Sequence, residues 1–385
     1  MTTYRWLTVG RVNADPIKNP EDRFWAVIPA GGVGTRLWPL SRAAAPKFLH
    51  DLTGSGQTLI RATYERLVPI SKERTMVVTG RAHHDAVRTQ LPDISESNLL
   101  LEPEPKDSAA AIGLAAAVLY HRDPEIIMGS FAADQVIGPD HVFRQAAREA
   151  IATAAEGYIV TIGIKPTYPS TGFGYIKAGA RLDVDNAPTA HGVQRFVEKP
   201  EQHLAEEYVA SGDYLWNAGM FVAPVGLMLE HLKRTEPELY EGLMEIAAAW
   251  GTQHQETVLE RIWPTLPKTA IDYAVAEPAA DAGVVAVIPG DFIWDDVGDF
   301  AAIARLNPAR DDSGVTVIGP TPRVYSDDST GVVVTDTSRV IALIGVENIV
   351  VVDTGDALLV TTTDDAQSVK QAVEALKAHG DDDVL

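Results

Sequence analysis

The chain has 385 residues, no cysteine and a formal net charge of −21 at pH 7. The absence of thiols excludes disulfides, thiolate catalysis and Cys-ligated zinc. The negative charge disfavours nucleic acid as a partner, because a protein surface that binds nucleic acid needs Lys and Arg to neutralise the phosphates. No apolar run reaches the roughly 20 residues of a membrane span and no secretory signal is evident, so we expect a cytoplasmic globular protein with no membrane partner.

From residue 23 onward, short apolar runs alternate with longer helical patterns, which is typical of βαβ units. The expected strands are Phe24 to Ala30, Thr75 to Thr79, Asn98 to Leu101, Ile126 to Ser130 and Tyr158 to Gly163. The helices expected between them are Thr58 to Val68, His83 to Leu91, Ser108 to Arg122 and Val142 to Ala155. The pattern predicts an α/β fold with a Rossmann-like, doubly wound and mostly parallel sheet, whose ligands lie beyond the carboxyl ends of the strands.

The pattern changes after Lys165, where strands are expected near Val193 to Val197 and Met220 to Val222. The last part of the chain is rich in Val and Thr and predicts a small β domain. Its expected strands are Val332 to Val334, Val340 to Ile344, Ile349 to Val352 and Leu358 to Thr362, followed by a helix from about Ala366 to Lys377. We expect the acidic tail Asp381 to Asp383 to fray, and no long-period repeat is evident.

The chain therefore divides into three predicted regions. An extension covers residues 1–22, a large α/β domain covers 23–310, and the small carboxyl-terminal β domain covers 311–385.

The strongest motif is GGVGTRLWPLSRAAAPK, which runs from Gly31 to Lys47 directly after the first expected strand. Its glycines let the backbone turn tightly and bring N–H groups against phosphate oxygens, while Arg36 and Lys47 add positive charge. The alternative is an ordinary Gly-rich turn. The motif has neither the third glycine of a dinucleotide-binding GxGxxG nor a Walker GK[ST].

This run resembles the GxGTRLxPLSRxxxPK signature of sugar 1-phosphate nucleotidyltransferases, and its WPLS form is similar to that of the mannose-1-phosphate guanylyltransferases. The resemblance implies a nucleotidyltransferase catalytic domain over residues 23–310. It also implies that Arg36 and Lys47 are catalytic, with Lys47 stabilising charge at the reacting phosphorus. The implied triphosphate-binding residues, besides Arg36, are Ala30, Gly31, Gly32, Gly34 and Thr35.

A second motif, EPEPKDSAAAIGLAA, starts at Glu102, where a strand ends and a helix begins. A carboxylate here can accept hydrogen bonds from guanine N1–H and the 2-amino group, a pair that adenine and uracil do not offer. Glu102 is therefore the predicted guanine reader, and the alternative is a solvated loop acid. The segment resembles EPxxRNTA of the guanylyltransferases, with Lys106 and Asp107 in place of Arg and Asn, and Ser108 is added to the predicted nucleotide-binding residues.

Two acidic segments are candidates for metal binding. FAADQVI places Asp134 just past an apolar strand, and FIWDDVGDF supplies Asp295 and Asp296. Magnesium prefers carboxylate and phosphate oxygens, and one or two protein carboxylates usually suffice. Resemblance to the family pattern W-x-D-V-G favours Asp296, so the predicted Mg²⁺ ligands are Asp134 and Asp296. Generic acidic loops are the alternative for both.

RFVEKP places Glu198 and Lys199 at a strand end, a combination that suits a sugar phosphate because the cation faces phosphate and the acid faces hydroxyls. Alone it would be read as a surface ion pair of little energetic value, but it resembles the family motif FVEKP. The segments TGFGYI and WNAGM resemble the family's sugar-binding segments. They imply contacts from Gly174, Tyr175, Asn217 and Gly219.

Together these motifs predict transfer of GMP from GTP to mannose 1-phosphate, by Mg²⁺-assisted in-line attack at the α-phosphorus. The alternatives are another pair of nucleotide and sugar phosphate, a catalytically silent regulatory homologue, and a nicotinamide-dependent dehydrogenase, which the missing GxGxxG disfavours. The resemblance implies a homo-oligomer, with a dimer favoured. Because the chain stops short of the isomerase domain fused to some relatives, only the transferase step is expected.

Overall fold

A nine-stranded sheet in the order β3-β2-β1-β4-β9-β6-β10-β8-β7 forms the centre of the larger part of the molecule. The computed structural model describes residues 19–32, 34–309, 314–320 and 322–385, so most of the predicted extension 1–22 lies outside the described residues. The strands are β1 (Phe24–Ala30), β2 (Thr75–Gly80), β3 (Leu99–Glu102), β4 (Ile127–Ser130), β6 (Ile159–Ile164), β7 (Gly174–Arg181), β8 (His191–Val197), β9 (Tyr214–Pro224) and β10 (Val285–Gly290).

The sheet is mostly parallel, as predicted. Strand β1 pairs in parallel with β2 and β4, β2 pairs in parallel with β3, and β10 pairs in parallel with β6. Strands β9 and β8 run against their neighbours. The carboxyl ends of the parallel strands therefore meet along one edge, where a doubly wound fold holds its ligands.

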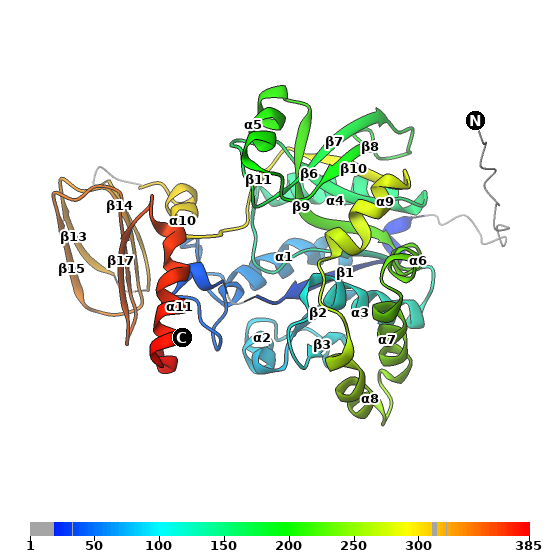
Figure 1. Ribbon diagram of the computed structural model, residues 1–385, viewed down its shortest axis with the longest axis horizontal. Coiled ribbons are helices and arrows are strands. Elements are labelled where there is room, and N and C mark those ends of the chain that lie inside the picture. Colours follow the sequence, from blue (N-terminus) through cyan, green and yellow to red (C-terminus); the bar gives the residue numbers. More distant parts are fainter. Residues whose placement is uncertain (1–18, 33, 310–313, 321) are drawn as a thin grey trace.

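Helices cover both faces of this sheet (Figure 1). One face carries α1 (Leu59–Ser71), α2 (His84–Gln90), α4 (Asp140–Ala155) and α5 (Gln202–Ser211). The other face carries α3 (Asp107–Arg122), α6 (Val225–Thr235), α7 (Pro237–Ala249), α8 (Gln255–Ile262) and α9 (Glu277–Asp281).

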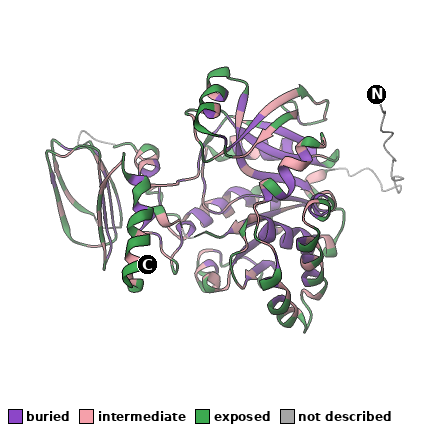
Figure 2. Ribbon diagram, viewed as in Figure 1, coloured by how far each residue is buried: buried purple, intermediate pink, exposed green. Residues whose placement is uncertain are grey.

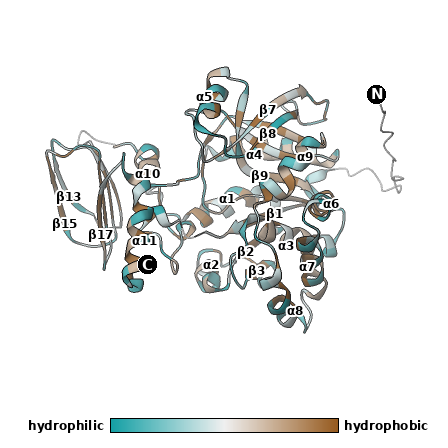
Figure 3. Ribbon diagram, viewed as in Figure 1, coloured by the Kyte–Doolittle hydropathy of each residue, from teal (hydrophilic) through white to brown (hydrophobic). Residues whose placement is uncertain are grey.

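The alternation of side chains along the strands explains these two layers. Successive residues of a strand point to opposite faces, so Ala26 and Ile28 join the core under α1 and α4, whereas Val27 joins the core under α3. Because both faces are covered, the strands are continuous apolar runs rather than alternating ones. Figure 2 shows that the strands of the large sheet are mostly buried. Figure 3 shows that many of the same segments are hydrophobic, in brown.

Several elements were not predicted. The short strands β5 (Val136–Gly138) and β11 (Ile293–Asp295) pair antiparallel outside the main sheet, and three residues are too few to show a period. Strands β7 and β10 and helices α6 to α10 were also missed, the last being α10 (Phe300–Leu306). Among the described residues, no helix is both long and apolar enough to pass through a bilayer.

The carboxyl-terminal part is a flattened coil of two sheets, here called the coil domain (residues 314–380). One sheet has the order β12-β14-β16-β17 and the other pairs β13 with β15. The strands are β12 (Val315–Ile318), β13 (Arg323–Asp327), β14 (Gly331–Thr335), β15 (Val340–Ile344), β16 (Ile349–Asp353) and β17 (Leu358–Thr362). The predicted boundary at 310/311 falls on residues outside the described set.

The coil domain contains a repeat that the sequence did not reveal. Val315 pairs with Gly331, and Gly331 pairs with Ile349, all in parallel, so the chain returns to the same register once in each turn of the coil. This repeat is one of backbone register and does not contradict the absence of a long-period repeat in the sequence. The backbone repeats while the side chains do not, because only the alternation of inward and outward residues is required.

The same alternation gives the coil domain two apolar faces. Val333 and Val351 point between its two sheets, whereas Val332 and Val350 point outward, toward α10 and the large domain. In Figure 1 the coil domain lies at one end of the molecule, and its helix α11 (Val369–His379) lies between its strands and the large domain.

The acidic tail after α11 is docked rather than frayed. Asp382–Val384 form a short 3-10 turn, and the indole N–H of Trp38 donates a hydrogen bond of 2.7 Å to the carbonyl oxygen of Val384. The expectation of a frayed tail was wrong because a buried indole N–H needs an acceptor, and Trp38 is only 9% exposed.

Candidate functional site

The Gly31 to Lys47 segment, here called the signature loop, follows β1 at the carboxyl edge of the sheet. Gly32 and Gly34 have φ of 86° and 72°, a region that favours glycine. A Cβ at Gly34 would also lie 2.9 Å from Cβ of Lys47. Gly34 therefore lets the loop close onto the lysine at its other end.

Lys47 stands at the centre of a charged cluster. It is only 7% exposed, and its Nζ lies 2.7 Å from Oδ2 of Asp134. The same Nζ donates a hydrogen bond of 2.5 Å to the backbone carbonyl oxygen of Asp296. The structure thus brings together three predicted residues from distant parts of the chain.

The β5–β11 pair explains how the two acids meet. Asp134 lies just before β5 and Asp296 just after β11, and Asp295 pairs with Val136 across the ribbon. Burial raises the pKa of Asp296, the Lys47 ammonium opposes this shift, and the carboxylates of Asp295 and Asp134 add to it. Asp134, Asp295 and Asp296 are therefore close enough for electrostatic interaction.

The two neighbouring acids after β11 have different surroundings. Oδ2 of Asp295 accepts a hydrogen bond of 2.6 Å from Arg305, and its Oδ1 accepts one of 2.8 Å from the N–H of Val297. Within the described chain, the Asp296 side chain makes no hydrogen bond or ion pair. Val297, which follows the two acids, has φ of 48°, a strained conformation for a β-branched residue.

Asp134 and Asp296 fit the donor set that Mg²⁺ uses. The described residues contain no group of three or more His, Asp or Glu side chains that could hold a metal on their own. Magnesium, however, commonly takes one or two protein carboxylates and completes its shell with phosphate oxygens and water. The two acids are of the right type and number, provided that a phosphate ligand supplies the rest.

Arg36 lies on the same loop as Lys47 but is exposed to solvent. It makes no hydrogen bond or ion pair with any residue that the structure describes, whereas Leu37, the next residue, is fully buried. An exposed guanidinium on an anchored loop is placed to meet an anionic ligand.

Glu102 ends β3 at the same edge of the sheet, where it is 7% exposed. Burial raises the pKa of its carboxyl to about 7. The two residues that depart from the family pattern lie nearby: Lys106 Nζ donates to the carbonyl oxygen of Pro264 at 2.8 Å, and Asp107 adopts φ of 69°. Ser108 Oγ accepts a hydrogen bond from the N–H of Ile271 at 2.9 Å, so its hydroxyl links two segments of the protein.

A second cluster gathers most of the predicted sugar residues. Lys199 Nζ lies 2.9 Å from Oε1 of Glu198, and Glu198 Oε2 is buried without a hydrogen-bond partner among the described residues. A Cβ at Gly174 would lie 2.4 Å from that same oxygen. Asn217 Oδ1 accepts hydrogen bonds from Thr161 and from the N–H of Gly219.

Asp272 belongs to this cluster and was not predicted. Its Oδ1 accepts a hydrogen bond of 2.8 Å from Asn217. Burial, and then the neighbouring charge of Glu198, raise the pKa of its carboxyl to about 6. It begins a π-helical turn, Asp272–Ala276, a feature frequent at functional sites. The available signal was one acid in an otherwise small and apolar run.

The structure does not bring the Tyr175 side chain to this cluster. Tyr175 is fully buried, its hydroxyl donates to the carbonyl oxygen of Ser170 at 3.0 Å, and its ring lies 5.4 Å from that of Tyr208. Gly174 faces Glu198, and the next residue of a strand points to the opposite face.

A cavity of about 940 Å³ lies beside the site but does not contain it. Its walls include the mutually packed rings of Tyr168, Phe173, Trp216 and Trp294. None of the predicted site residues is among its lining residues.

A glycine-rich loop, a buried lysine held by the Asp134 carboxylate and the backbone carbonyl of Asp296, and an acid at the end of β3 all lie at the carboxyl edge of a doubly wound sheet. This is the edge at which α/β enzymes of the doubly wound class hold their ligands. Residues 25–313 match the family model described as nucleotidyl transferase, and residues 323–376 match the MannoseP isomerase/GMP-like beta-helix domain. The chain belongs to the nucleotidyl transferase family.

Its relatives span nearly the whole chain. It is 38% identical over 354 residues to the mannose-1-phosphate guanylyltransferase of Klebsiella pneumoniae, covering 91% of this chain and 73% of that protein. It is 36% identical over 360 residues to the xanthan biosynthesis protein XanB of Xanthomonas campestris, covering 92% of this chain and 73% of that protein.

A solved structure has the same architecture. The crystal structure described as mannose-1-phosphate geranyltransferase from Thermus thermophilus is 35% identical, with a TM-score of 0.81, and the match covers 92% of this chain and 99% of that one. The fold, including the small carboxyl-terminal β domain, is therefore shared along the length of both chains.

Proposed function

We propose that this enzyme transfers GMP from GTP to mannose 1-phosphate, giving GDP-mannose and pyrophosphate. The observation that carries the proposal is the position of Lys47, buried between Asp134 and the carbonyl of Asp296 at the end of the signature loop. The names of relatives that are 35–38% identical supply the substrate pair.

The proposed step is an in-line displacement. A phosphate oxygen of the sugar 1-phosphate forms a bond to the α-phosphorus of GTP, while the bond from that phosphorus to the α–β bridging oxygen breaks and pyrophosphate leaves. The attacking oxygen is already anionic, so no general base is needed. Catalysis then consists of positioning and charge neutralisation, in which Arg36 and Lys47 offset charge on the phosphate oxygens.

Asp134 and Asp296 are the residues that would hold Mg²⁺. When bound, the ion supplies Lewis-acid neutralisation of phosphate charge. The acids themselves keep Lys47 at the carboxyl edge of the sheet, because one carboxylate and one carbonyl oxygen hold its ammonium from two sides.

Glu102 is proposed to select guanine. A carboxylate accepts hydrogen bonds from both N1–H and the 2-amino group, which favours the ionised form. Because burial raises the pKa of Glu102 to about 7 in the free enzyme, binding of guanine is expected to favour loss of its proton.

The second cluster is proposed to bind the sugar phosphate. Lys199 is half-exposed and faces the phosphate, while the buried Glu198 oxygen that has no partner in the described chain accepts from a sugar hydroxyl. Asp272 and Asn217 already share a hydrogen bond and form the floor of this cluster.

The deciding experiment is pyrophosphate release by the purified protein with Mg²⁺, crossing GTP, ATP, UTP and dTTP with mannose 1-phosphate and glucose 1-phosphate. Release that needs GTP and mannose 1-phosphate together supports the proposal. Preference for another pair keeps the reaction class and overturns the substrates, and silence across the grid favours a regulatory homologue. Repeating the active pair with EDTA tests the need for a divalent ion, and light scattering tests the expected homodimer.

A further inference from the structure

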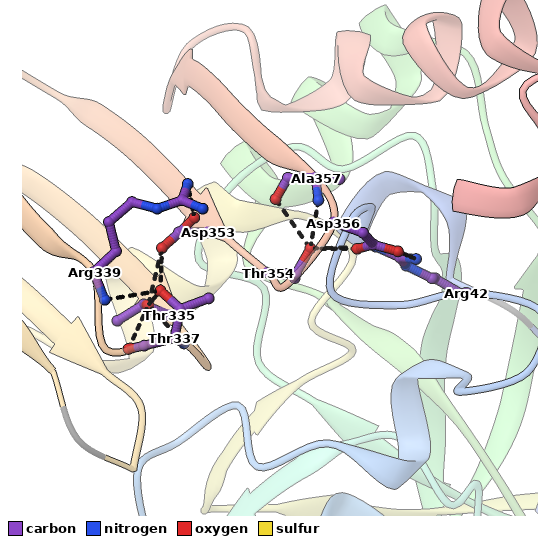
Figure 4. Close-up of polar contacts among 8 residues, drawn as sticks. All are labelled: Arg42, Thr335, Thr337, Arg339, Asp353, Thr354, Asp356 and Ala357. Atoms are coloured by element: carbon purple, nitrogen blue, oxygen red, sulfur yellow. Dashed lines mark hydrogen bonds and ion pairs between the residues drawn. The ribbon is translucent and has the colours of Figure 1, made fainter.

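The coil domain reaches the signature loop through an arginine. Arg42 lies in the loop and donates two hydrogen bonds to the carboxylate of Asp356, of 2.6 Å from Nη1 and 2.5 Å from Nη2. Nη2 also donates to Thr354 Oγ1 at 3.2 Å, and Nε donates to the carbonyl oxygen of Pro39 at 2.9 Å. Figure 4 shows this guanidinium extending from the loop to the turn after β16.

Both ends of this contact are held in place. Thr354 is 7% exposed, donates to Asp356 Oδ1 at 3.1 Å and accepts from the N–H of Ala357 at 3.2 Å. On the loop side, Arg42 and Ala45 exchange backbone hydrogen bonds of 3.0 and 3.1 Å. The hydrogen bond from Arg42 lowers the pKa of the Asp356 carboxyl to about 2, so the pair stays charged throughout the working pH range. Bidentate geometry of this kind fixes orientation as well as charge.

Apolar packing ties the same two parts together. Leu37 follows Arg36, Val297 follows Asp296, and both are buried in one cluster that includes outward-facing valines of the coil domain. Leu37 and Val297, the residues next to Arg36 and Asp296, are therefore packed in one apolar cluster with the coil domain. The hydrogen bond from Trp38 to Val384 and the contact of α11 with the Thr35–Leu37 turn complete this interface.

We propose that the coil domain positions the signature loop for nucleotide binding, and that Arg42 is the positioning residue that transmits this restraint from Asp356. The inference rests on the proposed function, since the loop is taken to hold the triphosphate. Without the contact between Arg42 and Asp356, here called the clamp, Arg36 and Lys47 would each occupy several positions. A displacement of about 1 Å lowers the reaction rate steeply.

The test uses Asp356→Ala in the full chain, because this change removes the clamp without touching the loop. We expect kcat/KM for GTP to fall by about 10- to 100-fold, with the KM for mannose 1-phosphate unchanged. Asp356→Glu, which retains a carboxylate, should recover part of the loss. Trp38→Phe, which replaces the indole with a smaller aromatic ring and removes the hydrogen bond to Val384, should act in the same direction with a smaller effect.

The matched control is Arg339→Gln. Arg339 pairs with the fully buried Asp353 at 2.7 Å in the same domain, on the side of Figure 4 away from the loop. It should lower the melting temperature and leave the kinetics for GTP unchanged. Equal kinetic losses in Arg339→Gln and Asp356→Ala would overturn a specific role for the clamp.

Hydrogen exchange separates this inference from the proposed function, because it needs no substrate. The N–H groups of Leu37, Trp38 and Ser41 donate within the loop, and their exchange should accelerate in Asp356→Ala but not in Arg339→Gln. If exchange accelerates in Asp356→Ala while the wild-type protein is inactive with GTP and mannose 1-phosphate, the role of the clamp is supported and the proposed substrates are wrong. Unchanged exchange together with unchanged GTP kinetics would overturn the clamp.

Discussion

The large domain and the coil domain both place acids at the carboxyl ends of parallel strands, yet they use them differently. In the large domain, Glu102 ends β3 unpaired within the described chain and Asp134 follows β4 with only a lysine beside it. In the coil domain, Asp353 at the end of β16 and Asp356 just after it are each bound by an arginine. The same strand geometry therefore carries the acids proposed to bind ligands in one domain and acids held by internal ion pairs in the other.

The role of each acid depends on whether its cationic partner is a lysine or an arginine. A guanidinium binds a carboxylate through a planar fork that leaves little room for another ligand, whereas an ammonium is a point charge that can be shared with phosphate. We therefore expect Asp134, paired with Lys47, to exchange partners when substrate binds, and the acids paired with Arg42 and Arg339 to hold the structure. The predictions below test that division.

The largest expected effect is that of Lys47→Ala. Removing the shared ammonium should lower kcat by about 10² to 10³, because electrostatic preorganisation at the reacting phosphorus is lost. Pyrophosphate release gives the rate, and Arg339→Ala, its counterpart in the coil domain, should leave kcat unchanged. A Lys47→Ala enzyme within a few-fold of the original rate would contradict the assigned role.

Glu102→Gln should stabilise the protein at neutral pH. The pKa of Glu102 is raised from 4.5 to about 7 on folding, so the folded state binds the proton more tightly. The cost of the buried charge is absent below pH 4.5, grows between pH 4.5 and 7, and is fully present above pH 7. The shift corresponds to about 3 kcal/mol. Urea unfolding of both proteins should show a difference at pH 8 that disappears near pH 4.5, and equal stability at pH 8 would refute the prediction.

Asp353→Ala should show the opposite behaviour in the coil domain. Asp353 is fully buried and accepts hydrogen bonds from Arg339 and Thr337, so its loss should lower the free energy of unfolding by about 2 kcal/mol. Chemical denaturation measures this change, while kcat of the folded enzyme should be retained. If Asp353→Ala were more stable than the wild type, the claim that the acids of the coil domain stabilise the fold would be wrong.

The smallest effect is expected in the pH dependence of GTP binding. Guanine needs the ionised Glu102, whose pKa is about 7, so the KM for GTP should rise by about tenfold between pH 8 and pH 6. In Glu102→Gln the KM for GTP should be higher at every pH and should no longer depend on pH, apart from the titration of GTP itself. A wild-type KM that is flat over this range would argue against Glu102 as the base reader.

The sequence predicted the larger domain well where periodicity is local and long. The strand Phe24 to Ala30 was placed with its observed bounds, and the helix at Ser108 to Arg122 differs by one residue. It failed where an element is short or where a contact is long-range. The ribbon of β5 and β11 has three residues on each side, and the docked tail depends on Trp38, more than three hundred residues away.

Residue type and local spacing are enough to predict the doubly wound fold, the signature loop and the identity of the acids near it. Which acid contacts which cation depends on how the whole chain folds. Asp295 and Asp296 are neighbours, yet the carboxylate of Asp295 binds Arg305 while the backbone carbonyl of Asp296 accepts from Lys47, a residue that only the folded chain brings to this position. Asp272 and Asp356 likewise acquired their roles from strand order and packing, since their partners are brought close only when the whole chain has folded.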